Sequence, residues 1–232
     1  MKNMEIKKLE WDSQFFGFPV GDIFIEEHFS DSLVLNSDTY KFFQVRSVFP
    51  TNIVSDTHLL TYWETKTIFS KKLTEKHYLN DIIFDYDEFP LSENSLYDLA
   101  YESGKHSRYK QDENITEEKF KELYKLWIVN SINKSFADKI FYFKENEEIL
   151  GFVTFKIKES FAQIGLIAVS PNSQGKGIGK KLLQCAENYC FKKNIEALFI
   201  PTQLENVPAC NFYRKMGYEI SEKIIIKHFW KR

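Results

Sequence analysis

The spacing of apolar residues along the chain predicts alternating strands and helices, most clearly in the second half. Residues 116–131 predict a helix, because apolar side chains recur there at helical spacing and Thr116 is a favoured N-cap residue. Further helices are expected at residues 92–104, 177–191 and 207–216. Runs rich in β-branched and aromatic residues predict strands at 42–48, 59–73, 140–143, 150–157, 161–169, 197–200 and 218–229.

Turn-forming residues between Asp85 and Pro90 mark an expected boundary within the chain. The segment before this boundary is rich in aromatic and β-branched residues, whereas the segment after it alternates between helix and strand patterns. We therefore predict an N-terminal domain of residues 1–88 and a second domain of residues 89–232.

Composition narrows the range of functions. The chain carries a formal net charge of −2 with interspersed charges, which argues against a nucleic-acid partner. No apolar run reaches the ~18 residues that span a bilayer, and residues 1–13 lack the apolar core of a signal peptide. Cys185, Cys190 and Cys210 have no metal-ligand spacing, as expected for buried thiols in a reducing compartment. We expect a cytoplasmic protein without a metal or a membrane partner.

The 22 Phe and 12 Tyr residues favour clefts that hold ring-shaped ligands.

A glycine-rich turn follows the apolar strand predicted at residues 161–169 and opens the next helix. Gly175, Gly177 and Gly179 let backbone N–H groups converge, and a helix N-terminus adds roughly half a positive charge, so the turn suits a pyrophosphate. Lys176 and Lys180 add charge at its rim. The turn is not a Walker loop, because Gly179-Lys180 is followed by a lysine, and its alternate glycines differ from the dinucleotide-binding fingerprint.

Two motifs in this half resemble those of the GCN5-related N-acetyltransferase (GNAT) superfamily. Gln174-Gly175-Lys176-Gly177-Ile178-Gly179 is similar to the family's glycine loop, and residues 206–218 are similar to its Asn-x-x-Ala-x-x-Phe-Tyr block. The resemblance covers residues 139–229. It implies an α/β (α+β) fold with a mixed, mostly antiparallel central sheet flanked by helices.

The resemblance also implies acyl-CoA as co-substrate, bound along a strand that splays from its neighbour. Asn206 is expected to contact the cofactor arm, and Tyr213 to lie near the thioester sulfur. The full set of implied cofactor-binding residues is Leu166, Ile167, Ala168, Val169, Gln174, Gly175, Lys176, Gly177, Ile178, Gly179, Lys180, Asn206, Ala209 and Tyr213.

Aminolysis of a thioester needs a neutral amine, a stabilised oxyanion and a proton for the leaving thiolate. A backbone N–H of residues 167–169 is a suitable oxyanion donor. Tyr213 is the expected general acid, because its ordinary pKa of ~10 is close to that of a thiol. The strands at 151–157 and 161–169 contain no carboxylate, and Glu159 lies in the turn between them. His106 and His228 are weak alternatives, so deprotonation through water, or an amine of low pKa, is expected.

The acceptor side resembles the family that acylates dTDP-linked amino sugars, represented by TDP-fucosamine acetyltransferase. The similar segments are residues 9–20, 107–110, 123–131 and 202–206. This resemblance implies a partial copy of the acyltransferase fold in the first half, a homodimer, and a dTDP-amino-dideoxy sugar with its amine at C3 or C4. The resemblance leaves the acyl group open between acetyl and a longer chain such as 3-hydroxybutyryl, and it implies O-antigen or capsule synthesis as the expected pathway.

The substrate residues that we assign on this basis serve three purposes. A diphosphate requires an arginine, for which Arg108 is the first choice and Arg46 the second. Tyr109 or Trp127 would stack on thymine or sugar, and Gln203 and Asn130 would bond sugar hydroxyls.

Two other functions remain open at the level of sequence. The first is an enzyme that acts on a different amine, such as a protein N-terminus, a polyamine or an aminoglycoside. Polyamines and aminoglycosides are cations that favour an acidic cleft, and no acidic cluster lies near the motifs. A CoA-binding module without turnover is the second alternative, because no base is evident.

Overall fold

The computed structural model describes residues 6–79 and 83–232. Within them, the helices are α1 (Glu10–Phe16), α2 (Asn94–Gly104), α3 (Arg108–Gln111), α4 (Glu117–Ile132), the 3₁₀ turn η1 (Pro171–Ser173), α5 (Ile178–Lys192) and α6 (Val207–Lys215). The strands are β1 (Lys7–Lys8), β2 (Val20–Ile25), β3 (Leu33–Val34), β4 (Phe42–Ser47), β5 (Ile53–Val54), β6 (His58–Lys72), β7 (Phe84–Asp85), β8 (Lys139–Glu145), β9 (Glu148–Lys158), β10 (Phe161–Val169), β11 (Ala197–Gln203) and β12 (Glu219–Lys231).

Every helix and strand expected from the sequence is present, with shifted ends. The predicted cap of α4 is confirmed, because the Thr116 side chain accepts a hydrogen bond from the backbone N–H of Lys119 at 3.3 Å. The short helices α1 and α3, and the strand β2, were not predicted. Strand β2 is buried at five of its six positions, so it lacks the alternation that identifies a half-exposed strand.

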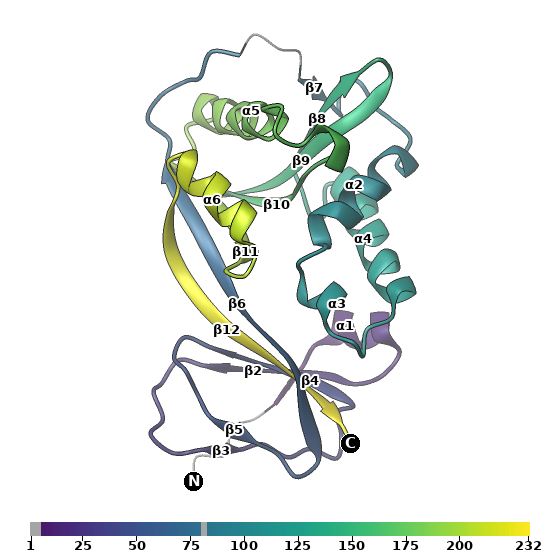
Figure 1. Cartoon of the computed structure of the whole chain (residues 1–232), viewed down its shortest axis with the longest axis vertical. Coiled ribbons are helices and arrows are strands. Elements are labelled where there is room, and N and C mark those ends of the chain that lie inside the picture. Colours follow the sequence, from purple (N-terminus) through teal and green to yellow (C-terminus); the bar gives the residue numbers. More distant parts are fainter. Residues whose placement is uncertain (1–5, 80–82) are drawn as a thin grey trace.

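Ten strands form one sheet in the order β1-β2-β4-β12-β6-β11-β10-β9-β8-β7. The pairs β2–β4 and β10–β11 are parallel and the other neighbouring pairs are antiparallel, which confirms the predicted mixed, mostly antiparallel fold. The long strands β6 and β12 run side by side from the lower part of the molecule up to the level of α6 (Figure 1). Strand β6 pairs with both β11 and β12, so the two sides of the expected boundary share one sheet.

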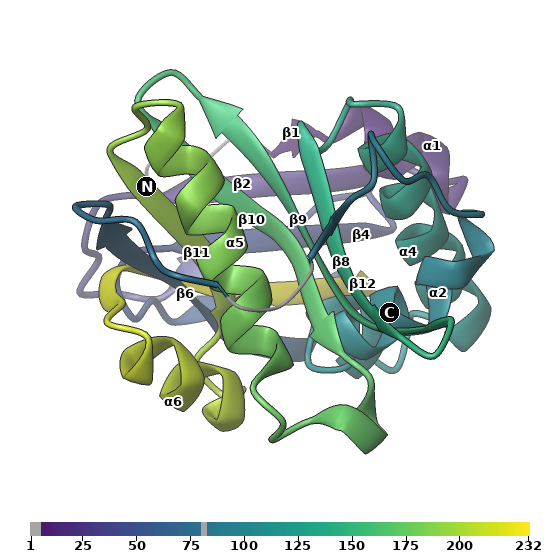
Figure 2. The same cartoon turned by 90° about the horizontal axis from the view of Figure 1, so that it is seen from above.

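Helices cover both faces of the sheet in the half that contains β8 to β11, with α5 and α6 on one side and α2 and α4 on the other (Figures 1 and 2). Alternate residues of β8 explain this arrangement: Ile140 and Tyr142 pack with α2 and α4, whereas Phe141 packs with α5. A smaller core packs residues of the first half, such as Phe43, against Phe229 of β12.

Candidate active site

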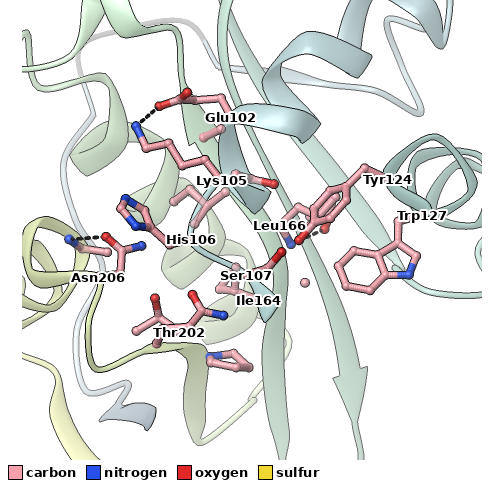
Figure 3. Close-up of a pocket in the computed structure, with 18 of the residues that line it drawn as sticks. Glu102, Lys105, His106, Ser107, Tyr124, Trp127, Ile164, Leu166, Thr202 and Asn206 are labelled. Carbon is pink, nitrogen blue, oxygen red and sulfur yellow. Dashed lines mark hydrogen bonds and ion pairs between the residues drawn. The ribbon is translucent and has the colours of Figure 1, made fainter. Parts of the chain in front are cut away.

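A cavity of about 1120 Å³ lies where β10 and β11 separate. These parallel strands pair only between Phe161–Gln163 and Ala197–Phe199, so their later residues diverge. Beyond Gln163, the edge of β10 that faces β11 has no strand partner among the described residues. The labelled side chains in Figure 3 come from α2, the α2–α3 link, α4, β10, β11 and the start of α6.

A bulge interrupts β10 at this point. Ile164 pairs with Phe155 and Ile167 pairs with Val153, so Gly165 and Leu166 both lie opposite a single residue, Thr154. The Leu166 N–H donates to the Thr154 hydroxyl at 2.9 Å. The bulge lies at the N-terminal end of the segment for which the sequence implied a splay. It leaves backbone groups of β10 available to a peptide-like ligand.

The glycine-rich turn forms one end of the cavity. Gly175 and Gly177 have φ angles of +81° and +82°, which favour glycine, and no atom lies within 4 Å of a Cβ at either position. Gly177 is also the N-cap of α5, so the first-turn N–H groups of this helix have no partner within the helix. Gln174 closes the turn through a 3.2 Å hydrogen bond to the Val169 carbonyl, and its amide also donates to Glu102 at 3.0 Å.

The cofactor residues implied by the sequence mostly converge on this cavity. Lys176 does not line it and is exposed on the turn. The residues that do line it are Leu166, Ile167, Ala168, Val169, Gln174, Gly175, Gly177, Ile178, Gly179, Lys180, Asn206, Ala209 and Tyr213.

Helix α6 brings Asn206 and Tyr213 to the opposite wall. Asn206 caps the helix, because its side-chain oxygen accepts from the Ala209 N–H at 3.3 Å. The Tyr213 ring packs against Phe69, with ring centroids 5.5 Å apart. Burial raises the pKa of Tyr213 above its ordinary value of 10, so its hydroxyl is protonated at neutral pH.

The predicted acceptor residues Arg108, Tyr109, Trp127 and Gln203 also line the cavity. The Arg108 guanidinium lies 4.5 Å from the centroid of the Tyr109 ring and donates to the Tyr109 hydroxyl at 2.9 Å. Burial acts to lower the pKa of Arg108, but Tyr109 and Glu64 outweigh it, so Arg108 remains a cation. Trp127 packs edge-on against Tyr109, with ring centroids 6.1 Å apart.

The structure does not bring the predicted residues Arg46 and Asn130 to the cavity lining. Arg46 is held by Asp22 through two hydrogen bonds of 2.7 and 2.5 Å, and it lies over Phe24. The Asn130 carbonyl accepts the N–H of Phe136 at 3.0 Å. Asp22 is distant from Arg46 in sequence, and the partner of Asn130 lies in an irregular loop. Local sequence patterns could therefore not reveal either position.

The carboxylate that the sequence analysis did not find is Glu64, on β6. Its side chain is 1% exposed and lines the cavity, and its Oε2 accepts from the Tyr62 hydroxyl at 3.1 Å. Its Oε1 has no hydrogen-bond partner among the described residues. Burial raises the pKa of Glu64, and Arg108 and Tyr62 offset part of that increase. A signal was present, because alternation along a strand places Tyr62, Glu64 and Lys66 on one face.

The two histidines considered as bases lie in different environments. His106 lines the cavity in the α2–α3 link (Figure 3). His228 is fully buried away from the lining, where its Nδ1 lies 2.7 Å from a carboxylate oxygen of Asp112. Glu159 is exposed, as expected for the turn between β9 and β10.

The sequence profile of the acetyltransferase (GNAT) family matches residues 95–218, and the chain belongs to this family. GNAT homologues bind acetyl-CoA or CoA as co-substrate. A GNAT-family protein from Novosphingobium aromaticivorans has the same fold: its crystal structure superposes with a TM-score of 0.56 at 10% identity, covering 82% of this chain and 74% of the other. No helix in the described part of the chain is both long and apolar enough to cross a membrane.

Two relatives illustrate the range of named functions. The spore coat polysaccharide biosynthesis protein SpsD of Bacillus subtilis is 28% identical over 136 residues, which cover 59% of this chain and 47% of SpsD. A streptothricin acetyltransferase of Escherichia coli is 36% identical over 59 residues, or 25% of this chain and 34% of the relative. The chain thus spans half or less of the length of these relatives.

Proposed function

We propose that the protein transfers an acyl group from acyl-CoA to the amine of a dTDP-linked amino-dideoxy sugar. One observation carries the proposal. A single cavity combines a glycine turn suited to a pyrophosphate, a splayed strand edge, and the proton-carrying groups Tyr213 and Glu64. Such a combination supports acyl transfer to an amine within a ternary complex, without a covalent enzyme intermediate.

In this proposal the glycine turn and the N-terminus of α5 bind the CoA pyrophosphate, since the first-turn N–H groups of this helix have no partner within the helix and carry partial positive charge. The pantetheine amides pair with the unpartnered edge of β10. Asn206 contacts the same arm, and the thioester lies between β10 and α6, next to Tyr213.

Proton transfer then follows from the two groups that line the cavity. Glu64 accepts a proton from the acceptor ammonium, directly or through water, and the neutral amine attacks the thioester carbonyl. A β10 N–H among residues 167–169 stabilises the oxyanion. When the intermediate collapses, the C–S bond breaks, and Tyr213 protonates the departing thiolate. The amide nitrogen loses its remaining extra proton to solvent, and CoA leaves as a thiol.

The acceptor assignment has separate support from sequence similarity. The family that acts on dTDP-amino sugars is similar to this chain in four segments, namely residues 9–20, 107–110, 123–131 and 202–206. In addition, SpsD is named for polysaccharide biosynthesis. We assign residues 1–88 to the acceptor side and expect a homodimer. Arg108 lies beside Glu64 in the cavity, where its charge suits a diphosphate.

The test is release of CoA thiol by the purified protein with acetyl-CoA and candidate amines. We expect turnover with a dTDP-3-amino- or dTDP-4-amino-dideoxyhexose, and comparison with 3-hydroxybutyryl-CoA identifies the preferred acyl group. Turnover only with a peptide, a polyamine or an aminoglycoside would establish the alternative acceptor class. Tight CoA binding without turnover on any amine would indicate a CoA-binding module.

A further inference from the structure

Two exposed aromatic side chains from distant parts of the sequence meet at the cavity. Trp11 of α1 is 40% exposed and Phe136, in the loop after α4, is 43% exposed. Both line the cavity, and their ring centroids are 6.5 Å apart with planes inclined at 58°. These rings are accessible to a ligand in the same space as Glu64 and Arg108.

The Trp11 ring is held in place from behind. Its indole stacks on Phe15 with ring centroids 5.4 Å apart and planes 4° apart. The Lys119 ammonium lies 4.6 Å from the centroid of the Phe15 ring and donates to the Phe15 carbonyl at 3.0 Å, which ties α1 to α4. One face of Trp11 is therefore covered by protein, and the ring is preorganised to present its remaining surface.

The backbone that carries Phe136 is also held in place. The N–H groups of Ser135 and Phe136 both donate to the Asn130 carbonyl, at 2.9 and 3.0 Å, which closes the loop onto the end of α4. A flat ring that contacts two aromatic surfaces needs ~3.5 Å on each side, or ~7 Å in total. The centroid separation of 6.5 Å is close to this, and because the ring planes are inclined at 58°, the Phe136 ring must turn towards the plane of Trp11 to hold a planar ligand between the two faces.

We propose that Trp11 and Phe136 form an aromatic clamp for the planar base of the acceptor nucleotide. This inference rests on the proposed nucleotide-sugar acceptor and identifies the part of the site that recognises its base. Aromatic side chains bind nucleobases by stacking, with ~1–3 kcal/mol lost per base on alanine substitution.

The charges between the clamp and Glu64 suit the diphosphate of the same ligand. Lys66 lines the cavity two residues from Glu64 on β6, and no carboxylate of the described residues forms an ion pair with it. Burial raises the pKa of Asp12, next to Trp11, and the nearby charge of Arg108 offsets part of that increase. Lys66 and Arg108 thus supply two cations for the diphosphate in the cavity that also contains the clamp and Glu64.

The experiment compares dTDP binding, measured by calorimetry, in matched pairs of variants. Trp11→Ala and Phe136→Ala remove the clamp, and Trp11→Phe keeps an aromatic surface. Trp63→Ala and Phe49→Ala are the controls, because these residues are 58% and 42% exposed and neither lines the cavity. We expect the Kd for dTDP to rise ~5- to 100-fold in the two alanine clamp variants and little in Trp11→Phe or the controls. The Kd for acetyl-CoA should stay unchanged in all five, which also reports intact folding.

The possible failures are distinguishable. If the wild-type protein binds dTDP but the clamp variants bind it as tightly as the controls, the clamp is wrong and the dTDP-sugar acceptor stands. If the wild-type protein binds acetyl-CoA but not dTDP, the nucleotide acceptor and the clamp are both overturned.

Discussion

The Nη1 atom of Arg108 lies 3.5 Å from the Oε1 atom of Glu64, and this pair joins α3 to β6 inside the cavity. The arginine favours ionisation of a carboxyl group that burial would otherwise keep protonated. Because the separation is longer than a strong hydrogen bond and Oε1 has no hydrogen-bond partner among the described residues, the carboxylate can still accept a proton. Glu64 therefore combines a raised pKa with an oxygen that is free of hydrogen bonds at the cavity lining, as a general base requires.

Replacing Glu64 by Gln should lower kcat ~10²- to 10⁴-fold, the range typical of a lost general base. Glutamine keeps the shape and can still accept the Tyr62 hydrogen bond, so the Kd for acetyl-CoA should not change. Steady-state kinetics and calorimetry measure the two effects. A wild-type kcat in this variant would show that solvent water, and not Glu64, deprotonates the acceptor amine.

The same substitution should change how stability depends on pH. The folded-state pKa of Glu64 is raised, so its contribution to stability is complete below the unfolded value of 4.5 and is lost as pH rises through the folded value. The glutamine side chain of the variant does not titrate. The free energy of unfolding of Glu64→Gln minus that of wild type should therefore increase from pH 4.5 towards pH 8. A difference that falls over this range would show that the Arg108 pair dominates and that the pKa is lowered.

Replacing Tyr213 by Phe should reduce kcat ~10²- to 10⁴-fold and leave CoA binding nearly intact, because only the acidic hydroxyl is removed. Tyr189→Phe is a matched control, since that ring packs between Phe141 and Phe155 and does not line the cavity. Equal rates for the two variants would remove Tyr213 from the mechanism.

Replacing Gly177 by Ala should weaken acetyl-CoA binding. Its φ of +82° costs a residue with a Cβ ~1–2 kcal/mol, and the turn must distort at the N-terminus of α5. Gly17→Ala is the control, since Gly17 has a φ of +77° at the end of α1, equally free of neighbouring atoms within 4 Å. Both variants should lose stability by similar amounts in urea unfolding. Only Gly177→Ala should raise the Kd for acetyl-CoA, and a similar rise for Gly17→Ala would contradict a specific role for the turn.

The sequence predicted the parts of the site that depend on local geometry. Glycines in a turn, an Asn at a helix start and an aromatic block on one helix each occupy a short segment, so their arrangement follows from their spacing. Glu64 is different: its strand meets the cavity through pairing such as Lys66 with Gln203, residues 137 positions apart. No local pattern encodes that register, so a carboxylate base was sought only on β9, on β10 and in the turn between them. The position of Arg46 outside the cavity lining was not foreseen for a similar reason, because its partner Asp22 lies on the unpredicted strand β2.

The buried pair of His228 and Asp112 predicts a loss of stability in mild acid. Burial lowers the pKa of His228. Burial acts to raise the pKa of Asp112, but the hydrogen bonds that it accepts from His228 and Trp230 outweigh this effect and lower the pKa to about 2. For both groups, the stabilising contribution is present above the unfolded pKa values of 6.5 and 3.8, and is lost as pH falls.

Urea unfolding between pH 7.5 and 5 tests this expectation. Below pH 6.5 the unfolded chain binds a proton that folded His228 does not, so wild-type stability should fall by up to ~1.4 kcal/mol per pH unit from this group. His228→Asn keeps a neutral donor for Asp112 and should flatten the slope, whereas His28→Asn, at an exposed position, should not. His58 also has a pKa lowered by burial and remains in both variants, so the difference between them reports His228 alone. Equal slopes for the two variants would mean that His228 takes up its proton in the folded protein as readily as in the unfolded chain.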